Sequence, residues 1–137
     1  IVILTSEFNR DLTEKLENIN IDFLKENGFL NIQKFLVPGA FEIPSTLKLI
    51  KKYIKPDLVL CFWVVIRWET THYEMVAWES ARAIMEISIE NPETNAIINA
   101  ILTCENEKQV IERISNTYAL SWLNLLSEKL KIKDNLW

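Results

Sequence analysis

Glycine is scarce in this chain, and its scarcity limits how the loops are made. Only two glycines, Gly28 and Gly39, occur among 137 residues, whereas an average protein contains about 7% glycine. The chain therefore lacks the glycine-rich phosphate loops of the common nucleotide-binding motifs. Its tight turns must be made by other residues.

Cysteine, basic charge and long apolar runs are limited as well. The two cysteines, Cys61 and Cys104, have no metal-type spacing and imply no disulfide framework, which is typical of proteins of a reducing cytoplasm. A net charge of −4 without a basic patch argues against a nucleic-acid-binding protein. The longest apolar run, residues 58–66, is too short to cross a membrane, and no secretory signal is visible.

The segments that remain alternate between apolar runs and amphipathic stretches. A length of 137 residues and 49% hydrophobic content predict a single domain, residues 1–137, with its own core. Predicted strands cover residues 1–5, 32–37, 57–66 and 96–102, and predicted helices follow them at 10–27, 43–54, 73–91 and 105–114, with one more at the C-terminal end. This alternation predicts a three-layer α/β/α sandwich around a four-stranded parallel sheet, doubly wound and flavodoxin-like.

Local signals set the expected limits of these elements. Asn9 can cap the first helix, and Gly28 can close it in a left-handed conformation. Thr103 can cap the helix over residues 105–114. Residues 57–66 are apolar throughout, which is typical of a parallel strand covered on both faces.

Ligands of doubly wound sheets bind beyond the carboxyl ends of the strands. Four distinctive loops are predicted to meet there: "SEFN", "PGAFEIP", "RWETTH" and "LTCEN". In the first, Phe8 either projects over the end of the sheet or packs as a hydrophobic staple on the first helix. In the second, Ala40, Phe41 and Glu42 present backbone amides at a helix start, which either bind a polar ligand or form only a stiff turn.

The third loop carries the strongest local signal. Glu69, Thr70 and Thr71 lie at a predicted helix start, where free amides and hydroxyls suit a phosphate. His72, the only histidine, is either a structural residue or a proton carrier beside that anion site. Arg113 lies near the end of its helix and either interacts with the helix dipole or clamps a phosphate.

Three sequence motifs that contain these residues resemble the motifs of a known protein family. "VPGAFEIP", "VIRWETTHYEMV" and "AILTCENEKQVIER" occur in this order, and nearly the whole chain resembles the 6,7-dimethyl-8-ribityllumazine synthase family. "ESARAIMEIS" and "NAIINAILT" look most like alphaproteobacterial members. The resemblance implies condensation of 5-amino-6-ribitylaminouracil with 3,4-dihydroxy-2-butanone 4-phosphate, with loss of phosphate and water. This is the penultimate step of riboflavin synthesis, and it needs no metal or organic cofactor.

The resemblance also implies a role for each matching position. Phe8 would stack on the pyrimidine ring, and His72 would be the acid/base for imine formation and phosphate elimination. The ribityl-bearing substrate would contact Ala40, Phe41, Glu42, Val64, Val65 and Ile66, and the phosphate would contact Glu69, Thr70 and Arg113. Asn99 falls at a substrate-binding position where many members have Phe. Members form homopentamers, decamers or sixty-subunit shells with sites between neighbouring subunits, and riboflavin synthase is an implied partner.

Several aromatic residues depart from the family pattern. Trp63, Trp68 and Trp122 stand where glycines are usual, Trp78 stands where Asn is common, and Ala100 replaces another glycine. A tryptophan held at φ > 0 would cost about 1–3 kcal/mol, and an indole at position 68 would either fill the phosphate pocket or turn outward. Two hypotheses follow: an active lumazine synthase, or a catalytically impaired relative that serves as an assembly or ligand-binding protein. An unrelated phosphate-binding module is disfavoured by the missing glycine-rich loop.

Overall fold

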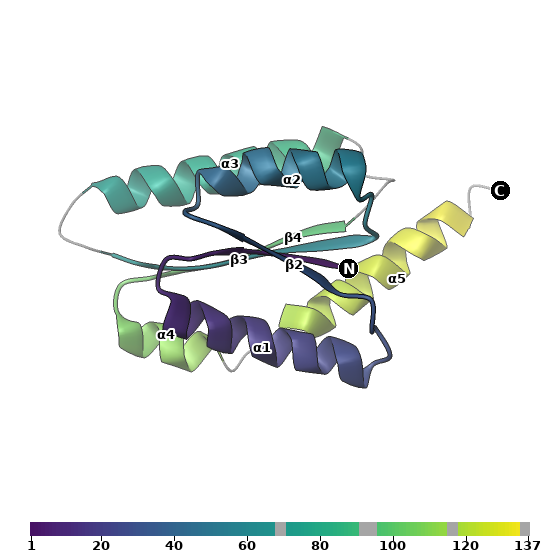
Figure 1. The fold of residues 1–137 in the computed structure, drawn as a ribbon, viewed down its shortest axis with the longest axis horizontal. Helices are drawn as coiled ribbons and strands as arrows, with labels where there is room; N and C mark the ends of the chain where they lie inside the picture. The colour runs from purple at the N-terminus through teal and green to yellow at the C-terminus, as the bar shows by residue number, and fades with distance from the viewer. Residues whose placement is uncertain (68–70, 91–95, 115–117, 135–137) are drawn as a thin grey trace.

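Four parallel strands form the central sheet, in the order β2-β1-β3-β4 (Figure 1). The computed structural model describes residues 1–67, 71–90, 96–114 and 118–134. The strands are β1 (Val2–Ser6), β2 (Gln33–Val37), β3 (Leu58–Ile66) and β4 (Ala96–Cys104), and the helices are α1 (Arg10–Glu26), α2 (Glu42–Tyr53), α3 (His72–Glu90), α4 (Glu107–Ile114) and α5 (Tyr118–Asp134). The predicted flavodoxin-like α/β architecture is confirmed.

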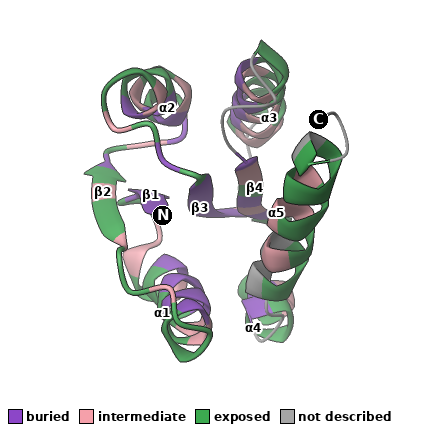
Figure 2. Cartoon of the chain, turned by 90° about the vertical axis from the view of Figure 1, so that its right-hand side faces the viewer, coloured by how far each residue is buried: buried purple, intermediate pink, exposed green. Residues whose placement is uncertain are grey.

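The helices cover the sheet on both faces, with α2 and α3 on one side and α1, α4 and α5 on the other (Figure 2). Strand β3 supplies both cores in alternation. Leu60, Phe62 and Val64 belong to the core under α1 and α4, whereas Trp63 and Val65 belong to the core under α2 and α3. This double burial is the physical reason why the sequence of β3 is apolar throughout.

The structure corrects two of the three predicted helix caps. Gly28 has φ 87° just beyond α1, as predicted. Asn9 lies at the start of α1 with φ 49°, but its side-chain amide donates to the carbonyl of Val64 at 2.8 Å and caps nothing. Thr103 is not a cap, because β4 continues through it opposite Val65. Asn106 caps α4 instead, and its Oδ1 accepts a hydrogen bond from the amide of Gln109 at 3.0 Å.

A buried carboxylate ties α1 to the edge of the sheet. The side chain of Glu17 is 0% exposed, and its Oε2 accepts hydrogen bonds from Thr5 Oγ1 at 2.8 Å and Arg10 Nη1 at 3.1 Å. Lys34 on β2 forms an ion pair with the other oxygen. A buried charge needs such partners, so this cluster fixes the first helix over β1 and β2.

None of the described helices is both long and apolar enough to span a lipid bilayer.

Candidate active site

The carboxyl ends of the four strands are joined to one another by hydrogen bonds. The amide of Glu7 donates to the carbonyl of Val37 at 2.8 Å, which links the ends of β1 and β2. The Asn9 side chain reaches Val64 at the end of β3, and the amide of Arg67 donates to the carbonyl of Cys104 at 2.9 Å. The four predicted loops therefore begin side by side at the carboxyl ends of the strands, which we call the carboxyl edge of the sheet (Figure 1).

The first two loops place an aromatic ring and a helix start on this edge. Phe8 is 64% exposed, so its ring is not packed away as a staple would be. Ala40 is buried, Phe41 is half exposed and Glu42 begins α2. In the described chain no side chain caps the amides at this end of α2, so they are available to a polar ligand. Val64 and Val65 are buried beneath these loops, and Ile66 is half-buried.

His72 and Arg113 both lie at the carboxyl edge, His72 at the start of a helix and Arg113 near the end of one. His72 is the first residue of α3 and is exposed. Arg113 is in the last turn of α4, and its Nη1 donates to the carbonyl of Thr103 at 3.4 Å. Burial raises the pKa of the Cys104 thiol, and the charge and hydrogen bond of Arg113 oppose that rise. The guanidinium of Arg113 lies beside the carboxyl end of β4. Glu69 and Thr70, together with Trp68, lie outside the described residues.

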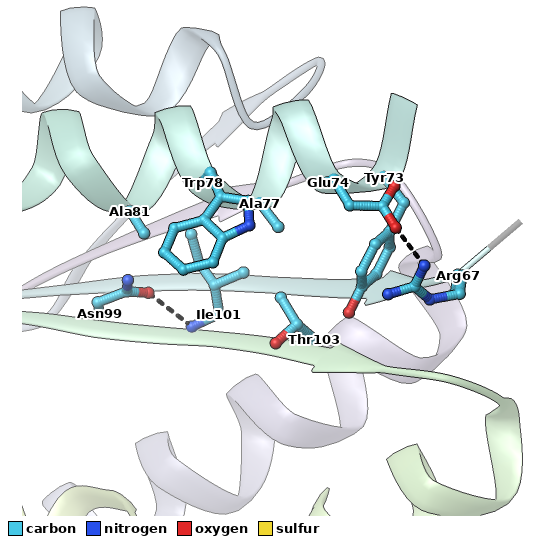
Figure 3. Close-up of a pocket in the computed structure, with 9 residues that line it drawn as sticks. All are labelled: Arg67, Tyr73, Glu74, Ala77, Trp78, Ala81, Asn99, Ile101 and Thr103. Carbon is cyan, nitrogen blue, oxygen red and sulfur yellow. Dashed lines mark hydrogen bonds and ion pairs between the residues drawn. The ribbon is translucent and has the colours of Figure 1, made fainter. Parts of the chain in front are cut away.

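Arg67 is a functional candidate that the sequence analysis did not single out. Its guanidinium forms ion pairs with Glu74 on α3 and with Glu105 after β4, where Nε lies 2.9 Å from Oε2. It also lies 4.7 Å from the ring centre of Tyr73 (Figure 3). Burial lowers the pKa of Arg67, but the charges of Glu105 and Glu74 and their hydrogen bonds raise it above its usual value. The sequence signal was an arginine immediately after an uninterrupted apolar strand.

A cavity of about 370 Å³ opens beside Arg67, between α3 and β4 (Figure 3). Its lining comprises Arg67, Tyr73, Glu74, Ala77, Trp78, Ala81, Asn99, Ile101 and Thr103. The indole of Trp78 lies over Asn99 and Ile101 (Figure 3). Asn99 pairs with Cys61 in mid-strand and lies about 17 Å along β4 from Cys104 at ~3.3 Å per residue. Of the predicted site residues that the structure describes, Asn99 alone is therefore set apart from the carboxyl edge.

Of the three tryptophans that replace family glycines, only Trp63 has a side chain that the structure describes. Trp63 is 6% exposed and packs in the core beneath α2 and α3, outside the cavity lining. Its indole Nε1 is buried and has no hydrogen-bond partner among the described residues. Trp63 is therefore a core residue, which weakens the idea that it blocks the site. Ala100 is also buried, on the opposite face of the sheet, and the side chain of Trp122 lies outside the described part of the chain.

Comparison with known proteins shows the family to which this chain belongs. The family model described as 6,7-dimethyl-8-ribityllumazine synthase matches residues 1–131. The chain belongs to the lumazine synthase family.

Two lumazine synthases are similar to this chain over most of its length. The chain is 37% identical to 6,7-dimethyl-8-ribityllumazine synthase of Pyrococcus furiosus over 141 residues, covering 98% of this chain and 88% of the relative. It is 32% identical to the protein of the same name from Prochlorococcus marinus subsp. pastoris over 126 residues, covering 88% and 78%. The likeness to alphaproteobacterial members stays a prediction.

Proposed function

We propose that this chain is an active lumazine synthase, which condenses 5-amino-6-ribitylaminouracil with 3,4-dihydroxy-2-butanone 4-phosphate and releases phosphate and water. The observation that carries the proposal is the position of His72 in a member of this family. The single imidazole is exposed at the start of α3, on the edge where the loops after β1, β2 and β3 begin. An imidazole at that edge can take and return protons near neutral pH.

The other residues of the edge suit the remaining parts of the reaction. The exposed ring of Phe8 offers a stacking surface for the pyrimidine. The amides of Ala40, Phe41 and Glu42 bind the ribityl-bearing substrate above Val64, Val65 and Ile66. Arg113 pairs with the phosphate, which a guanidinium can hold with two hydrogen bonds. Glu69 and Thr70 complete the phosphate site.

His72 then serves both halves of the chemistry. As a general acid/base it carries protons while the amine of the uracil and the ketone of the second substrate form an imine and water leaves. It does the same when phosphate is eliminated and the ring closes. The described residues include no group of three or more His, Cys, Asp and Glu side chains arranged to hold a metal ion.

Turnover of the two substrates tests the proposal directly. The purified protein is mixed with both substrates, and lumazine is followed by absorbance and fluorescence. We expect product from the wild type, a loss of about 100-fold or more in turnover with His72→Ala, and roughly tenfold weaker use of the phosphate substrate with Arg113→Ala. No product under conditions where another family member turns over would favour the impaired relative, and a normal rate for His72→Ala would disprove its role.

We also propose that the chain works as a homopentamer, either alone or within decamers or shells. An uncovered apolar stripe on α3 supports self-association: Met75, Trp78, Met85 and Ile89 are 58–75% exposed and follow a spacing of three, seven and four residues. Such a 3–4 pattern is typical of helices that pack against one another, and the stripe is about 21 Å long at 1.5 Å per residue. Asn99, at the open edge of β4 beside Trp78, would then reach the site of a neighbouring subunit.

Native mass spectrometry tests the assembly. We expect a mass of about five times the 16.1 kDa of one chain, or a multiple of it. Met85→Glu should shift the protein towards single chains, because it puts a charge in the middle of the stripe. Lys48→Gln removes an exposed ion pair between α2 and α3 and should leave the mass unchanged. A wild type that stays a single chain would contradict the proposal.

A further inference from the structure

Arg67 joins the first turn of α3 to the end of β4 and the residue that follows it. Its backbone amide is bound to Cys104 at the end of β4, and its Nε donates to Glu105 Oε1 at 3.1 Å in the following loop. Its Nη1 is bound to Glu74 in the first turn of α3. The guanidinium therefore connects the helix that begins with His72 to the loop that precedes α4, the helix of Arg113.

The charges at this junction are unbalanced. One guanidinium faces the carboxylates of Glu74 and Glu105, which are 39% and 57% exposed. The second oxygen of Glu74 is buried and has no hydrogen-bond partner among the described residues. Without Arg67, two negative charges would stand beside the first turn of α3, which His72 begins, and they would repel an incoming phosphate.

We propose that Arg67 keeps the anion-binding end of this site open to phosphate by neutralising Glu74 and Glu105 beside it. The inference rests on the proposed function only for the identity of the phosphate-bearing substrate. The proposal itself predicts that inorganic phosphate binds near His72 and that this binding depends on Arg67.

The contribution of Arg67 differs from ordinary structural support. Exposed ion pairs add little to stability, so replacing Arg67 should leave the fold intact. The two carboxylates remain in the variant, however, and a charge acts on a dianion over several ångströms. Phosphate binding should therefore suffer far more than stability, and removing one carboxylate should restore most of it.

The single histidine provides a direct probe. Because His72 is the only imidazole in the chain, its carbon–proton signal in a ¹³C-labelled NMR sample can be followed as inorganic phosphate is added. Wild-type protein is compared with Arg67→Gln, with Arg67→Gln/Glu74→Gln, and with Lys48→Gln. The last variant is a matched control, because it removes an exposed ion pair of α3 far along the helix, between Lys48 and Glu90.

We expect Arg67→Gln to require roughly tenfold more phosphate for the same signal change. The phosphate concentration that the double variant requires should return to within about threefold of the wild-type value. Lys48→Gln should require the same phosphate concentration as the wild type. The difference between wild type and Arg67→Gln should also shrink as salt rises to about 0.5 M. Circular dichroism confirms that each variant is folded.

Three results would overturn the inference: no response of His72 to phosphate in the wild type, an unchanged response in Arg67→Gln, or no recovery in the double variant. Failure of the proposed function is distinguishable from all of them. A protein that makes no lumazine but shows the expected phosphate dependence would refute the enzyme assignment and support the role of Arg67.

Discussion

Replacing Trp63 tests whether this residue belongs to the core or to the site. Its side chain is 6% exposed beneath α2 and α3, in the company of Val65, Val76 and Ile84. Truncating a buried Trp to Ala removes the ring contacts and leaves a cavity, which costs about 3–5 kcal/mol. At about 3 °C per kcal/mol for a domain of this size, the midpoint of thermal unfolding should fall by about 9–15 °C.

Trp63→Phe separates packing from polarity. Phenylalanine keeps most of the aromatic surface but removes the buried N–H that has no partner among the described residues. The lost contacts destabilise the protein, whereas removing an unsatisfied donor relieves a penalty of about 1–3 kcal/mol. We therefore expect a net change within about 1 kcal/mol.

The assays are thermal and urea unfolding, both followed by circular dichroism at one protein concentration, because assembly adds to apparent stability. Leu30→Ala is the control, since Leu30 is 77% exposed and its truncation should change stability by less than about 0.5 kcal/mol. A cost below about 1 kcal/mol for Trp63→Ala would refute the core assignment. An equal loss in Trp63→Phe and Trp63→Ala would refute the reasoning about the buried N–H.

Three further predictions concern other parts of the fold. Glu17→Gln should lower the free energy of unfolding in urea by about 2–3 kcal/mol, because Lys34 and Arg10 lose a buried carboxylate. Glu14→Gln on the exposed side of α1 should change it very little. Equal losses in the two variants would contradict the role of the buried carboxylate. Burial raises the pKa of Cys61 from 9.0 to about 12. Between pH 9 and about 12 the folded state keeps the thiol proton, whereas the unfolded state loses it. The free energy of unfolding therefore has its full value below pH 9 and falls as the pH rises from 9 to about 12. Wild type should accordingly lose up to about 1.4 kcal/mol more per pH unit than Cys61→Ala in that range, and parallel curves would disprove it. Asn106→Ala should cost about 1 kcal/mol by removing the cap of α4, whereas Thr103→Ala should leave α4 capped, which amide hydrogen exchange of α4 can check.

The sequence alone predicted the architecture because the relevant signals are local. An uninterrupted apolar run is sufficient to predict a strand buried on both faces, and helical spacing predicts which residues face the sheet. The parallel order of the strands then implied that the loops after them share one edge. The prediction of Phe8, Ala40, Phe41, Glu42, Val64, Val65, Ile66, Glu69, Thr70, His72, Asn99 and Arg113 as site residues came from motifs rather than from packing.

Contacts between distant residues were decided only by the tertiary structure. The amide of Asn9 binds Val64, 55 residues away, although its local context predicted a cap. Arg67 meets Glu105 across 38 residues, and no local pattern marks the pair. Strand register placed Asn99 opposite Cys61 and away from the loops, and helix packing enclosed Trp63 in a core where a glycine had been expected. Periodicity records which face of an element is buried, but the partner of a polar side chain depends on how whole elements are brought together.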